Sequence, residues 1–139
     1  MKILDTSIII GILRGDSEIK KVIEDLRSEE AATTVLTFFE IFSRIYHRNL
    51  RNEERIVRRM LRLMPILEFD EAAADKAAEI MGRLLKIGKP INAIDVMISG
   101  IALANGVEEI ITKDSDFKVI EKVCDELKIN LLNQQILGS

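Results

Sequence analysis

The sequence of 139 residues contains one cysteine, one histidine and no tryptophan. The single cysteine, Cys124, cannot form an internal disulfide, so nothing indicates an oxidising compartment. A zinc site built from cysteine and histidine is excluded because these residues are too scarce. No apolar run approaches the roughly 20 residues that span a bilayer, and Asp5 interrupts the apolar start that resembles a signal peptide. We therefore expect a cytoplasmic protein that is not associated with a membrane.

An excess of positive charge is also lacking, because the net charge is -3. Proteins that coat nucleic acid by bulk attraction are strongly basic, so this class is excluded. With 47% hydrophobic and 31% charged residues, the composition is that of a globular protein. The length suits one domain with one core, and we expect residues 1–139 to form it.

Short apolar runs alternate with amphipathic segments along the chain. The expected strands cover residues 2–5, 31–36, 66–68, 109–112 and 129–132. The expected helices cover residues 6–13, 19–26, 37–45, 53–64, 71–87, 93–104 and 117–127, with Asp70 and Asn92 as caps of two of them. Strands that alternate with helices imply right-handed crossovers. The pattern predicts an α/β fold, a three-layer α/β/α sandwich with a mostly parallel central sheet.

Five acidic residues lie where predicted strands end or predicted helices begin: Asp5, Glu40, Asp95, Asp114 and Asp116. Ligands of open parallel sheets bind outside the carboxyl ends of the strands, so these positions carry the most functional weight. Each aspartate also has a structural interpretation, because a carboxylate caps or stabilises the start of a helix.

Two interpretations apply to Glu40, which follows Thr37 by three residues. The pair has the spacing of a capping box, in which the glutamate reaches back to a free backbone amide. However, Phe38, Phe39 and Phe42 surround Glu40 in the sequence. A carboxylate that is partly buried among them needs a cation or hydrogen bonds to compensate. We favour the second interpretation.

The combination of acids is more informative than any one of them. Four separate segments each bring a carboxylate to the same expected end of the sheet. Oxygen ligands alone suit a hard cation such as Mg²⁺ or Mn²⁺. Without a cation the crowded carboxylates would repel one another and have raised pKa values. The sequence therefore predicts a divalent-metal site suited to phosphodiester hydrolysis.

Four segments of the chain resemble the signatures of PIN-domain ribonucleases, in their order and approximate spacing. They are Ile3-Leu4-Asp5-Thr6-Ser7, Thr37-x-x-Glu40, Ile94-Asp95-Val96-Met97-Ile98-Ser99 and Thr112-Lys113-Asp114-Ser115-Asp116-Phe117. The resemblance covers essentially the whole chain and is greatest to the VapC-like toxins of VapBC toxin-antitoxin pairs. It implies a metal-dependent endoribonuclease with an RNA substrate, a homodimeric state and a VapB-like antitoxin that blocks the site.

The resemblance also assigns expected roles. Asp5, Glu40, Asp95 and Asp114 match the acidic quartet of the family, with Asp116 in or beside the metal shell. Two further residues, Ser7 and Thr112, match its small hydroxyl positions.

The chain departs from the family pattern at two places. Ser99-Gly100 stands where two alanines are common, and the stretch Val107-Glu108-Glu109 contains one residue more than the family pattern. The offset of one residue in the second stretch leaves open how Asp114 and Asp116 divide their roles. A catalytically silent PIN-like scaffold that binds RNA or protein is the alternative function. A haloacid-dehalogenase-type phosphatase is excluded, because Ser7 stands where it requires a second aspartate.

Basic residues gather in one part of the chain. They step by four and three residues, which would align them on one helical face if the helix continues past Asn52: Arg44, Arg48, Arg51, Arg55, Arg58 and Arg62. A solvated charged face is the structural interpretation. The functional one is contact with an RNA backbone or a protein partner, because guanidinium groups pair with phosphates and carboxylates. We assign that contact to Arg44, Arg48, Arg51 and Arg55.

Overall fold

The computed structural model describes residues 1–26 and 30–132. Its strands are β1 (Lys2–Leu4), β2 (Ala31–Thr34), β3 (Ile66–Leu67), β4 (Glu109–Thr112) and β5 (Lys128–Leu131). Its helices are α1 (Thr6–Leu13), α2 (Ser17–Glu24), α3 (Val35–Arg48), α4 (Arg51–Leu61), α5 (Glu71–Lys86), α6 (Ala93–Ala104) and α7 (Asp116–Val123). Every expected element is present; 6–13, 93–104 and 109–112 match the expected bounds, and the other elements have ends shifted by a few residues. Within the described ranges, no helix is both long and apolar enough to cross a bilayer.

The five strands form one sheet in the order β3-β2-β1-β4-β5. All four pairings are parallel, and Ile3 of β1 lies opposite Ala32 of β2 and Ile110 of β4. The expected α/β class is therefore confirmed, and the sheet is parallel throughout the described strands rather than mostly parallel.

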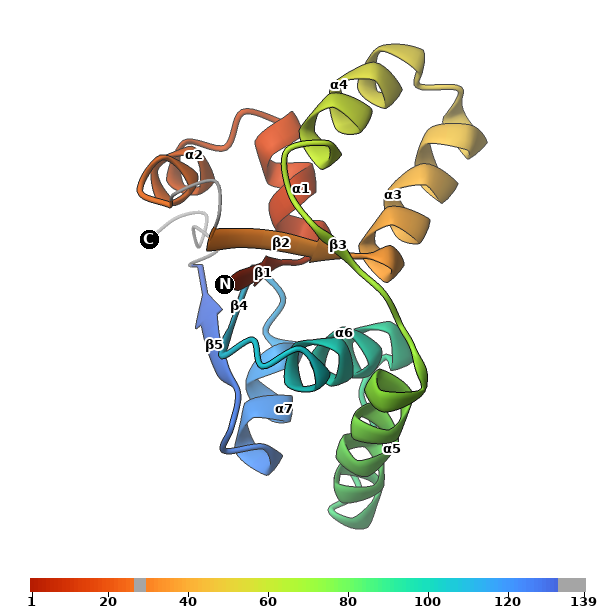
Figure 1. Cartoon of the computed structure of the whole chain (residues 1–139), viewed down its shortest axis with the longest axis vertical. Coiled ribbons are helices and arrows are strands. Elements are labelled where there is room, and N and C mark those ends of the chain that lie inside the picture. The colour runs from red at the N-terminus through yellow and green to blue at the C-terminus, as the bar shows by residue number, and fades with distance from the viewer. Residues whose placement is uncertain (27–29, 133–139) are drawn as a thin grey trace, which may run out of the picture.

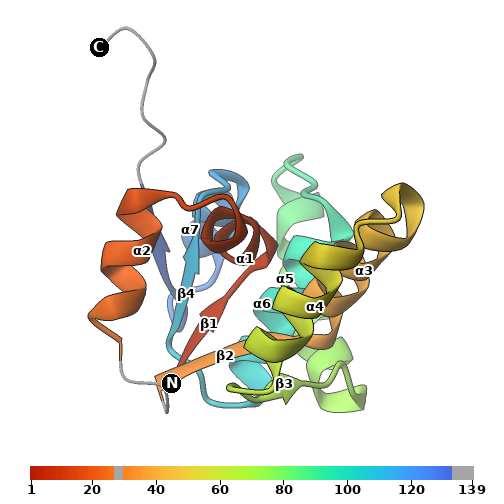
Figure 2. The same cartoon turned by 90° about the horizontal axis from the view of Figure 1, so that it is seen from above.

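Helices cover both faces of the sheet (Figure 1). Helices α1 to α4 lie on one face and α5 to α7 on the other, and Figure 2 shows α3 and α4 side by side. Successive strand residues point to opposite faces. Accordingly, Ile3 and Ile110 belong to the core beneath α5, α6 and α7, while Leu4 and Ile111 belong to the core beneath the other four helices. The three-layer prediction is confirmed.

The strand order defines where a ligand can approach the sheet. Strands β1 and β4 are neighbours, but the chain passes from β1 to β2 on one side and from β4 to β5 on the other. Such a reversal opens a crevice at the carboxyl ends of the two strands. Asp5 directly follows β1, and Thr112 is the last residue of β4. Both residues therefore lie at the crevice.

Close packing of α5 against α6 explains one departure from the family pattern. A Cβ atom at Gly100 would lie 2.5 Å from the carbonyl oxygen of Ala73 and 2.7 Å from Ala77. An alanine at position 100 would therefore push the two helices apart. The neighbouring Ser99 is buried, and its hydroxyl donates a hydrogen bond to the carbonyl of Asp95 at 2.9 Å. This pair of residues suits the helix contact that positions Asp95.

Candidate metal centre

Asp5 lies at the centre of a hydrogen-bond network at the end of β1. Its side chain is buried, with 4% exposed. One carboxylate oxygen, Oδ1, accepts hydrogen bonds from the Ser7 hydroxyl at 2.6 Å and the Ile8 amide at 3.2 Å. The other oxygen, Oδ2, accepts from the Thr112 hydroxyl at 2.6 Å. Asp5 therefore caps α1, as its structural interpretation requires, and also joins β1 to the end of β4.

The two hydroxyl groups that hold Asp5 also hold the loop after β4. The Ser7 hydroxyl accepts a hydrogen bond from the Lys113 amide at 2.9 Å. The Thr112 hydroxyl accepts from the Asp114 amide at 2.9 Å. Each hydroxyl thus donates to one carboxylate oxygen of Asp5 and accepts from one backbone amide of the loop. Ser7 and Thr112 fix the position of Asp114 relative to Asp5.

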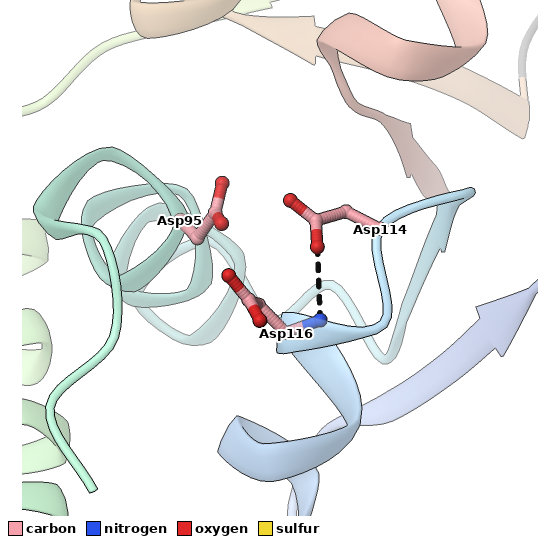
Figure 3. A group of neighbouring side chains, drawn as sticks. All are labelled: Asp95, Asp114 and Asp116. Carbon is pink, nitrogen blue, oxygen red and sulfur yellow. Dashed lines mark hydrogen bonds between the residues drawn. The ribbon is translucent and has the colours of Figure 1, made fainter.

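Three of the predicted acids face one another across the crevice. Oxygen atoms of Asp95, Asp114 and Asp116 all lie within 4.8 Å of one another, and their carboxylates point inward (Figure 3). Asp95 lies in the first turn of α6, which Asn92 caps through the Ile94 amide at 2.8 Å. The Asp116 amide donates to Asp114 Oδ1 at 2.9 Å, which ties the two loop acids together. Oxygen donors at this spacing match the ligand set that a hard divalent cation requires.

Electrostatics connects the remaining two acids to this cluster. Burial is the largest cause that raises the pKa of Asp95, to about 7, and the charges of Asp114, Asp5 and Glu40 raise it further. Burial also raises the pKa of Asp5, although hydrogen bonds from Ser7, Thr112 and the Ile8 amide oppose the rise. The structure therefore brings all five predicted acids into one electrostatic site. Raised pKa values in a crevice are typical of functional sites.

Glu40 does not form the capping box considered from the sequence. Helix α3 begins at Val35, and its cap is Thr34, whose hydroxyl accepts from the Thr37 amide at 3.2 Å. Thr37 therefore lies inside the helix, where it cannot cap it. The Glu40 carboxylate instead accepts a hydrogen bond from the Thr6 hydroxyl at 2.5 Å. The capping-box interpretation was wrong because the helix begins two residues earlier than its apolar face indicates, with Thr34 and not Thr37 as its cap.

Sequence reasoning missed three residues around the site. Thr6 holds Glu40 and lies 3.3 Å from the Thr37 hydroxyl. The Lys113 ammonium contacts the Asp16 carboxylate at 2.5 Å, across 97 residues of sequence. The position of Thr6 between Asp5 and Ser7 was a local signal for its role. No local signal indicates the contact between Lys113 and Asp16.

The arginines do not form one continuous face. Helix α3 ends at Arg48, and Asn49 adopts a left-handed conformation with φ of 53° before α4 begins. Arg44 pairs with Glu53 at 2.8 Å, which fastens α3 to α4. Arg48, Arg51 and Arg55 are exposed. The expected alignment was wrong because a tight turn separates the two helices.

The chain is similar to proteins of known family. The family model for the PIN domain matches residues 2–123. Ribonuclease VapC3 of Methanocaldococcus jannaschii is 33% identical over 99 residues, which are 71% of this chain and 95% of that protein.

Solved structures have the same fold. The crystal structure of FitAcB from Neisseria gonorrhoeae superimposes with a TM-score of 0.79 at 24% identity, over 93% of this chain and 96% of that one. The structure of VapBC2 from Rickettsia felis, bound to a DNA fragment from its promoter, gives a TM-score of 0.80 at 17% identity, over 95% and 98% of the two chains. Together with the family model and the VapC3 relative, the parallel sheet and its acidic crevice lead to one conclusion: the chain belongs to the PIN domain family.

Proposed function

We propose that this chain is a divalent-metal-dependent endoribonuclease that hydrolyses RNA phosphodiester bonds and serves as the toxin of a type II toxin-antitoxin pair. The observation that carries the proposal is the set of three carboxylates within 4.8 Å at the crevice of a PIN domain. The relative with 33% identity is named a ribonuclease. Structural neighbours include complexes of VapBC from Rickettsia felis and a toxin-antitoxin complex from Klebsiella pneumoniae.

The donor set selects the class of cation. Asp95, Asp114 and Asp116 would hold the ion, because carboxylate oxygens alone favour Mg²⁺ or Mn²⁺ over softer metals. A bound divalent cation supplies positive charge that offsets the charge developing on the phosphate and lowers the pKa of a nearby water.

Asp5 and Glu40 would support these ligands. The Asp5 carboxylate accepts three hydrogen bonds, and its two oxygens offer about four acceptor positions. One position therefore remains for a cation or a water molecule. The hydrogen bond from Thr6 fixes one oxygen of Glu40. Both acids are thus preorganised, which limits the rearrangement needed when the phosphate binds.

Partner contacts follow from the same assignment. A VapB-like antitoxin would bind this chain and block the crevice, the chain would form a homodimer, and both would act in the cytoplasm. Arg48 at the end of α3 and Arg51 and Arg55 in α4 are exposed and would contact RNA phosphates or carboxylates of a partner. Arg44 would contribute less, because Glu53 already occupies its guanidinium group.

A cleavage assay with a mixed RNA pool tests the proposal. The wild-type chain is expected to cleave RNA with Mn²⁺ and to lose this activity in a chelator. An Asp5→Asn and Asp95→Asn double variant, prepared in the same way, is expected to be inactive with Mn²⁺. Equal degradation by wild type and variant would mean that a contaminating nuclease is responsible. RNA that is retained in a gel but never cleaved would favour the silent scaffold.

A further inference from the structure

The ion pair between Lys113 and Asp16 links the metal-binding loop to a distant helix. Lys113 lies between Thr112, which holds Asp5, and Asp114 of the acidic cluster. Its ammonium group is 2.5 Å from Asp16 Oδ2, and the two side chains are 22% and 27% exposed. Partial burial lowers solvent screening, so this pair constrains its surroundings more than a surface pair does.

Asp16 is a rigid anchor for this contact. It caps α2, and its Oδ1 atom accepts from the Glu18 amide at 3.0 Å and the Ile19 amide at 3.2 Å. The second oxygen, Oδ2, is left for Lys113. The hydrogen bond from Lys113 is the largest cause that lowers the pKa of Asp16. Backbone amides on one side and an ammonium group on the other hold Asp16 in place.

The loop after β4 needs such a restraint. It brings Asp114 and Asp116 within 4.8 Å of Asp95, and like charges at this distance repel one another. Repulsion favours movement of the loop away from α6 when no cation is bound. Through its backbone amide Lys113 is fixed to Ser7, and through its side chain it is fixed to Asp16. These two attachments hold the start of the loop from two different elements.

We propose that Lys113 and Asp16 form a positioning pair that holds Asp114 and Asp116 at the spacing required for a divalent cation. The inference rests on the proposed function, because it assumes that the acidic cluster binds the cation. Neither residue touches the ion or the substrate. Their role is to keep the loop in place.

Calorimetric titration with Mn²⁺ tests the proposal, because removing the positive charge of Lys113 and removing the negative charge of Asp16 should both lower the affinity. Lys113→Met removes a positive charge near the cluster, so simple electrostatics would raise the affinity for Mn²⁺. Positioning requires the opposite, a loss of about tenfold, as is typical when an outer residue of a metal site is removed. Asp16→Asn removes a negative charge but keeps an oxygen to cap α2. We expect it to lower the affinity as well, so two opposite charge changes give the same direction of effect.

Three further variants and a folding check complete the experiment. Lys113→Arg should restore the affinity to within about threefold of wild type, because a guanidinium group also pairs with Asp16. The double variant Lys113→Met and Asp16→Asn should bind Mn²⁺ no more weakly than the weaker-binding of the two single variants, because the effects of coupled residues are not additive. The matched control is Lys118→Met, which removes a lysine paired with Glu121 at 3.1 Å, and it should bind Mn²⁺ as wild type does. Melting temperatures identify any variant that fails to fold.

The outcomes separate this inference from the proposed function. If the wild-type chain binds no Mn²⁺, the metal centre itself is refuted. If wild type binds Mn²⁺ and Lys113→Met binds it equally well or more tightly, the positioning pair is refuted while the metal centre stands. Loss of affinity in Lys113→Met and Asp16→Asn, with recovery in Lys113→Arg, supports the pair.

Discussion

Acidic residues gather at both ends of the sheet, but they are arranged differently. A hollow of about 710 Å³ at the amino end is lined by Glu108, Glu109, Glu121, Asp125 and Glu126 together with Lys2 and Lys128. Glu109 lies 3.7 Å from Lys2 and 3.5 Å from Lys128.

Glu121 at this amino end accepts from the Ile129 amide at 2.7 Å and lies 3.1 Å from Lys118. These contacts lower its pKa, with the backbone hydrogen bond as the largest cause. At the carboxyl end the pKa of Asp95 is instead raised to about 7, by burial first and then by neighbouring carboxylates. The number of acids therefore does not identify the site. What distinguishes the carboxyl end is crowding of carboxylates against one another, which protonation or a bound cation relieves.

The largest effect is expected when one acid at each end of the sheet is replaced, in separate variants, by its amide. Asp95→Asn is expected to lower kcat/KM for RNA cleavage by about a hundredfold, because it removes a proposed metal ligand. Glu109→Gln removes the same charge at the amino end and should leave kcat/KM within about twofold, because Glu109 pairs with Lys2 and Lys128 and not with the residues of the proposed site. Steady-state cleavage of one RNA by both variants measures the contrast. Equal losses would show that the two acidic ends do not differ in function.

The pH dependence of metal binding is the next largest effect. A cation held by the proposed site would bind the ionised form of Asp95, whose pKa in the metal-free protein is raised to about 7. The affinity for Mn²⁺ should therefore fall about tenfold between pH 8 and pH 6, since roughly one proton must be displaced for each ion bound. Calorimetric titrations at the two pH values measure this change. An affinity independent of pH over this range would mean that Asp95 is not a ligand.

Ionisation of Asp95 favours metal binding but should destabilise the metal-free folded protein. Asp95 has a higher pKa in the folded chain than its ordinary value of 3.8, so the folded form binds the proton more tightly. Its contribution to the free energy of unfolding is present below pH 4 and is lost as the pH rises to about 7. Asp95→Asn should thus be more stable than wild type at pH 8 by about 1 kcal/mol, a value reduced because the side chain is only half-buried.

Urea unfolding at pH 5 and pH 8 in a chelator measures this difference. Glu121 at the amino end provides the control, because its lowered pKa acts in the opposite direction. Its stabilisation is present above its ordinary pKa and is lost as the pH falls through the folded value. Glu121→Gln should therefore be no more stable than wild type at pH 8. A gain of stability in both variants would mean that net charge, not crowding, causes the effect.

The smallest expected effect concerns the hydroxyl donors that hold the crowded acids. Thr6→Val removes the hydrogen bond to Glu40 at nearly constant volume and should lower kcat/KM by less than about tenfold. Ser43→Ala is the control, because the Ser43 hydroxyl donates to the Phe39 carbonyl within α3 and not to a site residue. The melting temperatures of both variants should stay near that of wild type. A cleavage rate unchanged in Thr6→Val would mean that Glu40 is positioned by its helix alone.

Much of the fold followed from local pattern. Periodic apolar residues located α5 and α6, and Asp70 and Asn92 cap these helices through the Ala73 and Ile94 amides as expected. The start of α3 was misplaced, because Thr34 and Thr37 are both suitable caps and the sequence does not distinguish them. A break between the helices at 37–45 and 53–64 was expected, but it is shorter than expected, because only Asn49 and Leu50 separate α3 from α4.

Local chemistry in the sequence determined which acids stand at strand ends, because strand and helix periods are properties of adjacent residues. The distances between those acids were decided only by the tertiary structure. Packing of α6 and α7 on the sheet brings Asp95 within 4.8 Å of Asp114 and Asp116. Burial first, and then the neighbouring carboxylates, raise the pKa of Asp95. The contact between Lys113 and Asp16 joins residues 97 positions apart. No local pattern encodes such a distance, since it depends on how every intervening element packs.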